Sequence, residues 1–110
     1  MMKRKVIYRQ GDVLLAKVAS LPNGVTDITP PDRIVLAHGE VTGHAHTVKV
    51  QEGKTIPARY FDLKAERFLQ VLEKTALMHE EHSAVVLDRG VYKQAFQIEE
   101  KREEIRRVAD

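Results

Sequence analysis

The sequence contains no cysteine among its 110 residues. This absence excludes disulfide bonds, thiolate zinc sites and cysteine nucleophiles, so histidine and carboxylate groups remain as the reactive side chains. A chain without cysteine also suits a reducing compartment. We therefore expect a cytoplasmic protein.

Long apolar runs are absent as well. No segment approaches the roughly 20 apolar residues that a membrane-spanning helix needs, and the basic start MMKRKVIYRQGD lacks the apolar core of a signal peptide. The length fits one domain, residues 1–110, with a hydrophobic core of its own. We expect a single domain that is neither exported nor in contact with a membrane.

Net charge is small, because 18 lysines and arginines face 16 aspartates and glutamates. The acidic residues concentrate in HEE, IEE and REE, which leaves several cations without an acidic neighbour in sequence. This pattern favours a small anionic ligand over a broad nucleic-acid surface. The cations in question are Arg9, Lys17, Lys49, Arg59, Arg89 and Lys93.

The apolar pattern is that of short β-strands, with an alternating period of two and many Val, Ile, Leu, Tyr and Phe residues. Breakers such as LPNG, TPPD and QEGK separate these runs. Many short strands with little helix predict an all-β, mainly antiparallel small barrel or sandwich. The predicted strands cover residues 13–18, 33–37, 46–50, 59–63, 68–72, 75–79, 84–87 and 91–98.

Two stretches are compatible with a helix. Residues 62–74 fit either a helix or strands, and the charged residues 99–110 fit a C-terminal helix or tail. The clearest predicted hairpin is DRG at 88–90, which separates AVVL from VYKQAF. A small β-protein often covers its sheet edges with a second copy, so we expect a homodimer.

All five histidines fall in two short segments, AHGEVTGHAHTV and LMHEEHSA. Histidine titrates near neutral pH and is the commonest metal ligand, so this grouping predicts a single site for proton transfer or metal binding. In GHAH, His44 and His46 share a face if they lie on a strand, with Cβ atoms about 6.5–7 Å apart. His38 is the least certain member of the site.

The second segment, HEEH, places His79 and His82 three residues apart. On a strand these side chains point to opposite faces, so they converge only if the chain bends or makes a helical turn. The motif differs from the HExxH pattern of metalloproteases, whose histidines are four residues apart on a helix. Glu80 and Glu81 are candidates for a ligand, a base, or a group that orients a histidine.

Two chemistries fit these residues. In the first, His44, His46 and His82 bind a divalent transition metal together with Glu81 or His79. This region resembles the first motif of the cupin barrels, a glycine followed by HxH and a glutamate. Gly39 lies one residue too close to His44 for that motif, and Glu52 lies one residue too far from His46. The resemblance supports a cupin-like geometry.

In the second chemistry, histidines act without a metal as general base and general acid on an RNA-like phosphodiester. The predicted catalytic residues are His44, His46, His82 and His79. Cations would stabilise the charge on the phosphorane, and tyrosines would stack on a base or donate to phosphate. The predicted substrate-binding residues are Tyr8, Arg9, Lys17, Lys49, Arg89, Tyr92 and Lys93.

Over residues 9–98 the sequence resembles a group of small bacterial and phage proteins. The shared features are QGDVLL, HGEVTGHAH, and HEEH followed by a GxY pair, here Gly90 and Tyr92. The group resembles the CRISPR-associated ring nucleases of antiviral defence, which implies a cyclic oligoadenylate or a related small nucleotide as substrate. By position, that resemblance assigns the chemistry to His44, His46 and His82.

The sequence favours phosphodiester cleavage without a cofactor, and it leaves two alternatives open. One is a cupin-like metal-binding protein or metalloenzyme. The other is a noncatalytic binding module in which the histidines sense pH or hold a structural ion.

Overall fold

Ten β-strands form in the part of the chain that the structure, a computed structural model, describes: residues 6–38, 43–49 and 56–96. No helix occurs in those residues. The strands are β1 (Ile7–Gln10), β2 (Val13–Val18), β3 (Thr26–Asp27), β4 (Arg33–His38), β5 (Ala45–Lys49), β6 (Ala58–Leu63), β7 (Glu66–Val71), β8 (Thr75–Leu77), β9 (Val85–Leu87) and β10 (Gly90–Phe96).

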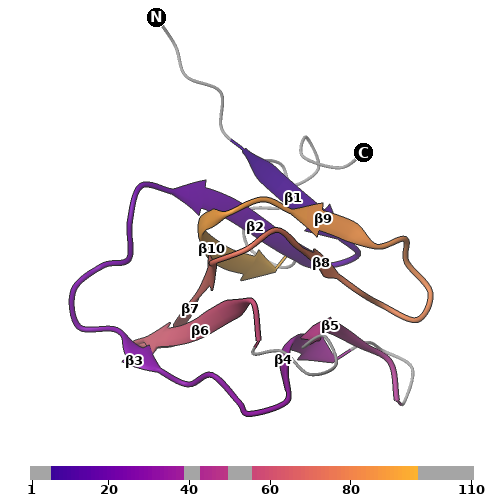
Figure 1. Ribbon diagram of the computed structural model, residues 1–110, viewed down its shortest axis with the longest axis horizontal. Helices are drawn as coiled ribbons and strands as arrows, with labels where there is room; N and C mark the ends of the chain where they lie inside the picture. The colour runs from indigo at the N-terminus through magenta and orange to yellow at the C-terminus, as the bar shows by residue number, and fades with distance from the viewer. Residues whose placement is uncertain (1–5, 39–42, 50–55, 97–110) are drawn as a thin grey trace, which may run out of the picture.

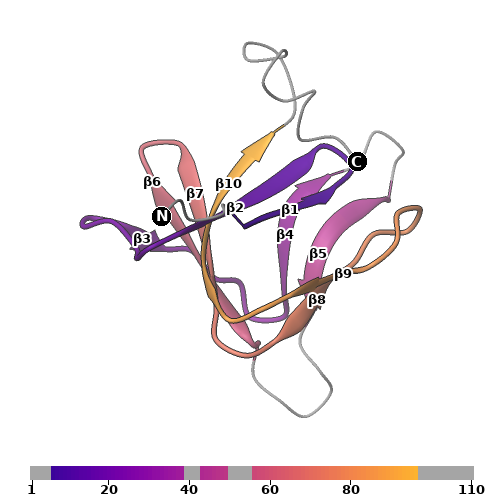
Figure 2. The ribbon, with the colours of Figure 1, turned by 90° about the horizontal axis from the view of Figure 1, so that it is seen from above.

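The strands form three sheets that curve around a common centre (Figures 1 and 2). Six of them form an antiparallel sheet in the order β1-β2-β10-β7-β6-β3, and β4 pairs with β5 and β8 with β9. β1 lies against β9, and an isolated bridge between Thr47 and Met78 links β5 to the end of β8. This arrangement confirms the predicted all-β, antiparallel small barrel or sandwich.

One hydrophobic core fills the space between these sheets. Burying one aliphatic side chain in such a core contributes about 1.5–3 kcal/mol to the stability of the fold. The fully buried large side chains are Tyr92, Leu15, Ile34, Leu69, Leu77, Leu87, Val13, Val48 and Val71.

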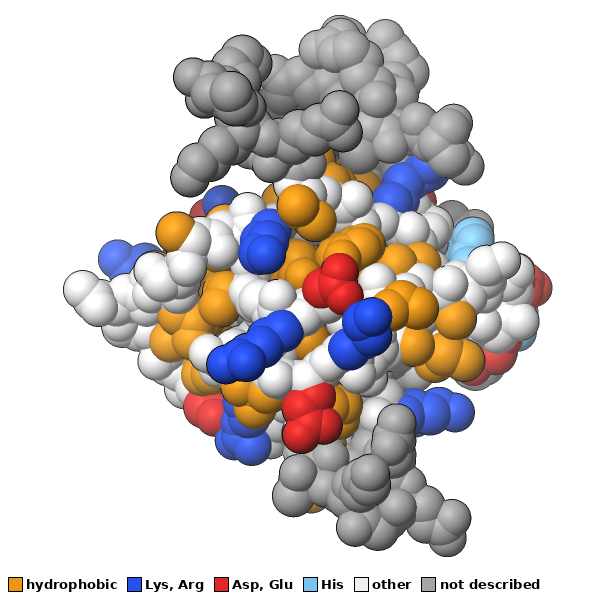
Figure 3. Space-filling model, turned by 45° about the horizontal axis from the view of Figure 1, so that its top comes forward, with side chains coloured by type: hydrophobic (Ala, Val, Ile, Leu, Met, Phe, Trp, Pro, Cys, Tyr) orange, Lys and Arg blue, Asp and Glu red, His pale blue; other side chains and the backbone are white. Residues whose placement is uncertain are grey.

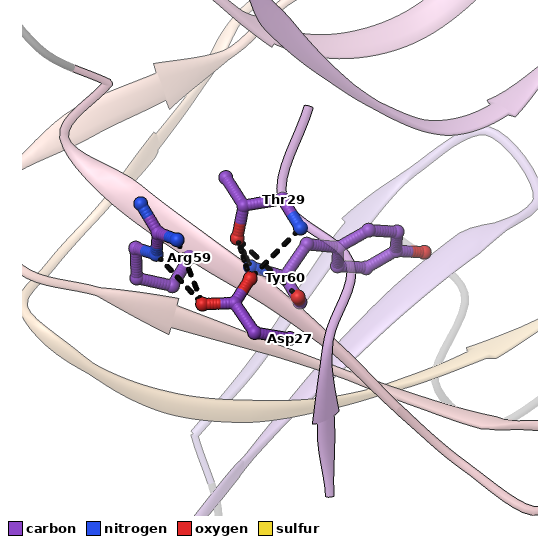
Figure 4. Close-up of polar contacts among 4 residues, drawn as sticks. All are labelled: Asp27, Thr29, Arg59 and Tyr60. Carbon is purple, nitrogen blue, oxygen red and sulfur yellow. Dashed lines mark hydrogen bonds and ion pairs between the residues drawn. The ribbon is translucent and has the colours of Figure 1, made fainter. Parts of the chain in front are cut away.

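A polar cluster fastens the short edge strand β3 to β6 (Figure 4). Asp27 Oδ2 accepts hydrogen bonds from Arg59 Nε and Nη2 at 3.1 and 2.7 Å, and Oδ1 accepts from the Thr29 amide and hydroxyl. The amide of Tyr60 in turn donates to Thr29 Oγ1 at 2.8 Å. The hydrogen bonds from Thr29 and Arg59 lower the pKa of Asp27 to about 2, so the carboxylate keeps its charge. Arg59 is therefore committed to a structural ion pair.

The strands predicted from alternation are all present, and within the described residues their ends differ by a residue or two. Two strands were missed. β1 is only four residues long and β3 only two, so neither has enough alternation to stand out. The strand alternative for residues 62–74 is confirmed, because β6 and β7 form a hairpin there, and the helical alternative is wrong.

The predicted hairpin at residues 88–90 is wrong. β9 pairs with β8, whereas β10 pairs with β2 and β7, so the chain passes from one sheet to another at this point. The hydroxyl of Tyr92 donates to the backbone carbonyl of Asp88 at 2.6 Å, as in the tyrosine corners of other β-proteins. This hydrogen bond stabilises a corner between two sheets. Corners and hairpins contain the same kinds of turn residue, which is why the sequence DRG was taken for a hairpin.

Some expectations lie outside the described residues, namely those for Gly39, Glu52 and the segment 99–110. Within the described residues, no helix is long and apolar enough to cross a membrane.

The β6–β7 turn yields a stability prediction. Both central residues, Lys64 and Ala65, have positive φ angles of 48° and 72°, as a type I′ turn requires, yet neither is glycine or asparagine. An L-residue with a Cβ pays about 1–2 kcal/mol in this conformation. We expect the variant Lys64→Asn/Ala65→Gly to raise the free energy of unfolding by about 1 kcal/mol in urea denaturation.

A matched control is Gly24→Ala. Gly24 has a φ of 87°, and a Cβ there would make only an ordinary contact with Leu63 at 3.8 Å, so its loss of stability reports the backbone conformation alone. A loss of stability in the Lys64→Asn/Ala65→Gly variant would contradict the account of this turn.

Candidate functional site

Four of the five histidines meet at one edge of the barrel, and we call them the histidine cluster: His44, His46, His79 and His82. The ring centroids of His46 and His79 lie 4.3 Å apart, and those of His79 and His82 lie 4.6 Å apart. His44 lies 5.7 Å from His79, and His46 lies 5.8 Å from His82. His79 is therefore the central member, in contact with the other three.

Strand register explains why the two histidine segments converge. Thr47 and Met78 are antiparallel partners that exchange two backbone hydrogen bonds of 2.9 and 2.8 Å. In an antiparallel pair the preceding residue on one strand lies opposite the following residue on the other, which places His46 beside His79. His44, which precedes β5, also contacts His79, so both histidines of GHAH reach a common neighbour.

The HEEH segment bends, as the convergence of His79 and His82 requires. The bend forms because His79 Nδ1 accepts hydrogen bonds from the amides of Glu81 and His82, at 3.0 and 3.4 Å. With Nδ1 acting as an acceptor, a neutral His79 ring carries its proton on Nε2. In this tautomer Nε2 is a hydrogen-bond donor and has no lone pair for a metal ion.

His46 is the most buried member, with only 4% of its surface exposed. Burial is the main cause that lowers its pKa to about 4, and the neighbouring rings of His79 and His82 lower it further. Its Nδ1 lies 2.8 Å from Oε1 of Gln10, at the end of β1. Sequence reasoning missed Gln10, since nothing in its local sequence indicates a contact with residues far along the chain.

His44 carries a buried nitrogen without a partner. Its Nδ1 makes no hydrogen bond among the described residues, and Oε2 of Glu81 lies 3.6 Å from it. Buried polar atoms in proteins nearly always have a hydrogen-bond partner, so an unpaired nitrogen of this kind indicates a place where a ligand can bind.

Glu80 contributes a carboxylate close to His44 and His79. Its Oε1 accepts a hydrogen bond from the amide of Ala45 at 2.9 Å, and this bond is the main cause that lowers its pKa. One ligand atom each from His44, His79 and Glu80 lie within 4.8 Å of one another. The sequence-based metal set was His44, His46 and His82 together with a glutamate, Glu81, or His79. The structure brings His44 and His79 together with Glu80.

Acidic groups surround the histidine cluster. Asp12 and Glu80 both act electrostatically on His46, and Glu81 lies beside His44. Figure 3 shows acidic side chains next to the histidines at one edge of the face that it displays. This environment favours a cation over an anion.

The predicted substrate-binding residues are spread over other parts of the molecule. Tyr8 donates to Asp88 Oδ2 at 3.3 Å and its ring contacts that of buried Tyr92 at 5.5 Å, while Lys93 pairs with Glu66 at 3.1 Å. Lys49 and Arg89 are exposed. None of these five makes a hydrogen bond, ion pair or ring contact with a described histidine.

Three further candidates have different positions. Lys17 reaches toward Gly90, since a Cβ added there would lie 3.1 Å from Lys17 Cε. Arg9 is nearer to the cluster, because its Nε donates at 3.1 Å to the carbonyl of Gly11, a residue that lies against His46 and His82. His38 is exposed at the end of β4 and takes part in none of the ring contacts described above.

The lowered pKa of His46 predicts a pH-dependent stability. Between pH 6.5 and about 4 the unfolded chain binds a proton at this residue that the folded chain does not, so stability falls as the pH falls through this window. We expect a loss on the order of 2–3 kcal/mol between pH 7 and pH 4, measured by urea denaturation in EDTA. The variant His46→Asn should lose this component, and an unchanged pH dependence would contradict the assignment.

The sequence matches a family model over residues 9–97, described as a domain of unknown function, DUF8820. No curated protein and no solved structure shows significant similarity to the chain. The matched region contains β2 to β10 and all four members of the histidine cluster. The chain therefore belongs to the DUF8820 family.

Proposed function

We propose that the protein binds a divalent transition metal ion through His44, His79 and Glu80. The observation that carries this proposal is the convergence of one ligand atom from each of these three side chains. In addition, the buried Nδ1 of His44 makes no hydrogen bond among the described residues. Imidazole and carboxylate together suit Zn, Fe, Mn, Ni or Cu.

Ring spacing supports the proposal. Two imidazoles that bind one ion through nitrogens at about 2.0–2.1 Å hold their ring centroids about 5 Å apart. The two proposed histidine ligands, His44 and His79, have ring centroids 5.7 Å apart, which is close to this value. The ionised Glu80 and its acidic neighbours offset the charge of a divalent cation.

His79 has to change its hydrogen bonds when it binds an ion. Its Nε2 carries the proton while Nδ1 accepts the amides of Glu81 and His82. To ligate through Nε2 as a neutral ring, His79 moves its proton to Nδ1, and the two amides lose their acceptor. Metal binding through Nε2 of His79 would therefore break the two hydrogen bonds that hold the HEEH bend.

The proposed chemistry is hydrolytic. A centre with three protein ligands leaves positions for water or a substrate, which is the arrangement of catalytic zinc sites, whereas structural zinc sites have four protein ligands. An ion in such a centre acts as a Lewis acid. We propose a reducing, cytoplasmic setting for this protein, in line with the absence of cysteine. A homodimer is likewise a proposal, supported by β1 and β3 as the end strands of the six-stranded sheet.

Zinc titration tests the metal centre. We expect one Zn²⁺ per chain by isothermal titration calorimetry, and at least a tenfold weaker affinity for His44→Ala and for Glu80→Gln, since each variant loses one ligand. His44→Ala should melt close to the wild-type temperature, because Nδ1 makes no hydrogen bond that the substitution removes. His38→Ala is the matched control and should bind like the wild type. Equal affinity of all four proteins would contradict the proposal.

A second candidate is metal-independent cleavage of an RNA-like phosphodiester, including a cyclic oligoadenylate. The observation that favours it is the pair His46 and His79, whose neighbouring rings are held in opposite tautomers, one with a free Nε2 lone pair and one with an Nε2 proton. Such a pair provides a general base beside a general acid. The carboxylates around the cluster weigh against it, because they repel a phosphodiester.

Turnover in EDTA separates the two candidates. From the acidic surroundings we expect no cleavage of a cyclic oligoadenylate in excess EDTA. Cleavage that survives EDTA and is abolished by His46→Ala would instead establish histidine acid–base catalysis. In that case the products should carry a 2′,3′-cyclic phosphate, and the deoxy analogue should resist.

A further inference from the structure

The HEEH residues lie in the connection between β8 and β9. Pairing of these two strands ends at Leu77 and Val85, so residues 78–84 cross from one strand to the other. This connection carries two of the three proposed ligands, His79 and Glu80. The third ligand lies ahead of β5, far away in the sequence, so the metal centre depends on what holds this connection in place.

The side chain of Gln10 joins the two ends of the connection. Gln10 is the last residue of β1 and is only 2% exposed. Its Nε2 donates to the carbonyl of Leu77, at the end of β8, at 2.8 Å, and to that of Ser83, ahead of β9, at 2.9 Å. Thr47 in β5 also holds the β8 end, through Met78, whereas at the β9 end the described residues give the Ser83 carbonyl one partner, Gln10. One amide therefore closes the base of the connection.

His46 holds this amide in its orientation. Carbonyl oxygens only accept hydrogen bonds, so the NH₂ group of Gln10 faces Leu77 and Ser83 and uses both of its protons there. Oε1 then faces His46 Nδ1 at 2.8 Å, and Nδ1 is the donor of this hydrogen bond. Among the described residues, the ligand atoms that converge belong to other side chains, so His46 acts as a buried support of Gln10.

Metal binding increases the importance of the Gln10 hydrogen bonds. In the metal-free protein the HEEH bend is also held from within, because His79 Nδ1 accepts hydrogen bonds from the amides of Glu81 and His82. Ligation through Nε2 of His79 breaks those two bonds. The bonds of Gln10 involve backbone carbonyls at the base of the connection, so an ion does not compete for them.

We infer that Gln10 is a positioning residue of the metal centre, which ties the two ends of the HEEH connection together and keeps both of its ligands facing His44. The inference rests on the metal centre proposed above, and it leaves that centre with three protein ligands and with open positions for water or a substrate. Residues that orient metal ligands without touching the ion typically contribute about 10–100-fold to metal affinity.

The chain offers a matched control for Gln10. Gln94 in β10 is 7% exposed, donates through Nε2 to the carbonyl of Leu36 at 2.9 Å, and accepts a hydrogen bond from the Tyr60 hydroxyl. It makes no hydrogen bond with a described histidine. Replacing either glutamine with methionine removes a buried amide and keeps a side chain of similar size, and only the Gln10 substitution frees the ends of the HEEH connection.

Zinc affinity and a double-mutant cycle test the inference on the full chain. By calorimetry we expect Gln94→Met to bind Zn²⁺ like the wild type, and Gln10→Met to bind it about 10–100-fold more weakly. Because Gln10 acts through the HEEH ligands, its effect should shrink in the Glu80→Gln background, whereas a general loss of stability would act independently of Glu80. Full additivity in this cycle, or an unchanged affinity of Gln10→Met, would overturn the inference.

A measurement on the wild type keeps the inference testable if Gln10→Met does not fold. Scalar couplings across hydrogen bonds should connect Nε2 of Gln10 with the carbonyl carbons of Leu77 and Ser83, both without zinc and at zinc saturation. Loss of the Ser83 coupling at zinc saturation would overturn the inference and leave the metal centre in place. A wild-type protein that binds no zinc would overturn the metal centre itself and with it this role of Gln10, although the couplings would persist.

Discussion

The hydrogen bonds of the Gln10 side chain are the interaction on which the site depends. They join the end of β1 to β5 and to both sides of the HEEH bend, three segments that are far apart in the sequence. An apolar side chain at this position would leave two carbonyls and one imidazole N–H buried without partners, at a cost of about 1–3 kcal/mol each. The barrel brings the histidines near one another, and Gln10 determines how one of them is oriented.

Electrostatics then decides between the candidate chemistries. The chain has a formal net charge of +2, yet the groups nearest to the histidine cluster include Asp12, Glu80 and Glu81. Several of the cations are committed elsewhere, as Arg59 is to Asp27 and Lys93 to Glu66. A site with imidazoles, carboxylates and few cations stabilises a metal ion better than a phosphodiester, which is why the metal centre is the first proposal.

Local patterns predicted the fold better than the site. Alternation located the strands, and the HxH spacing correctly placed His44 and His46 toward a common neighbour, because both depend on the period of a strand. The requirement for a bend at HEEH followed from the same geometry. The corner at residues 88–90 was taken for a hairpin, since turn residues do not reveal which strands pair on either side.

The ligand set depended on contacts that the sequence does not encode locally. Glu81 lies beside His44, yet it is Glu80 that converges with both His44 and His79, because the amide of Ala45, 35 residues away, holds the Glu80 carboxylate. Gln10 acts on a histidine 36 residues away. The choice between two adjacent glutamates, or the role of a single glutamine, follows from tertiary packing and strand register.

The most direct measurement of the central claim is the anomalous scattering of zinc in crystals of the zinc-loaded protein. The account predicts one strong anomalous peak within about 2.0–2.2 Å of a nitrogen of His44, a nitrogen of His79 and an oxygen of Glu80. A peak only at the exposed His38, or no peak at the histidine cluster in zinc-saturated crystals, would contradict a metal centre at this edge of the barrel.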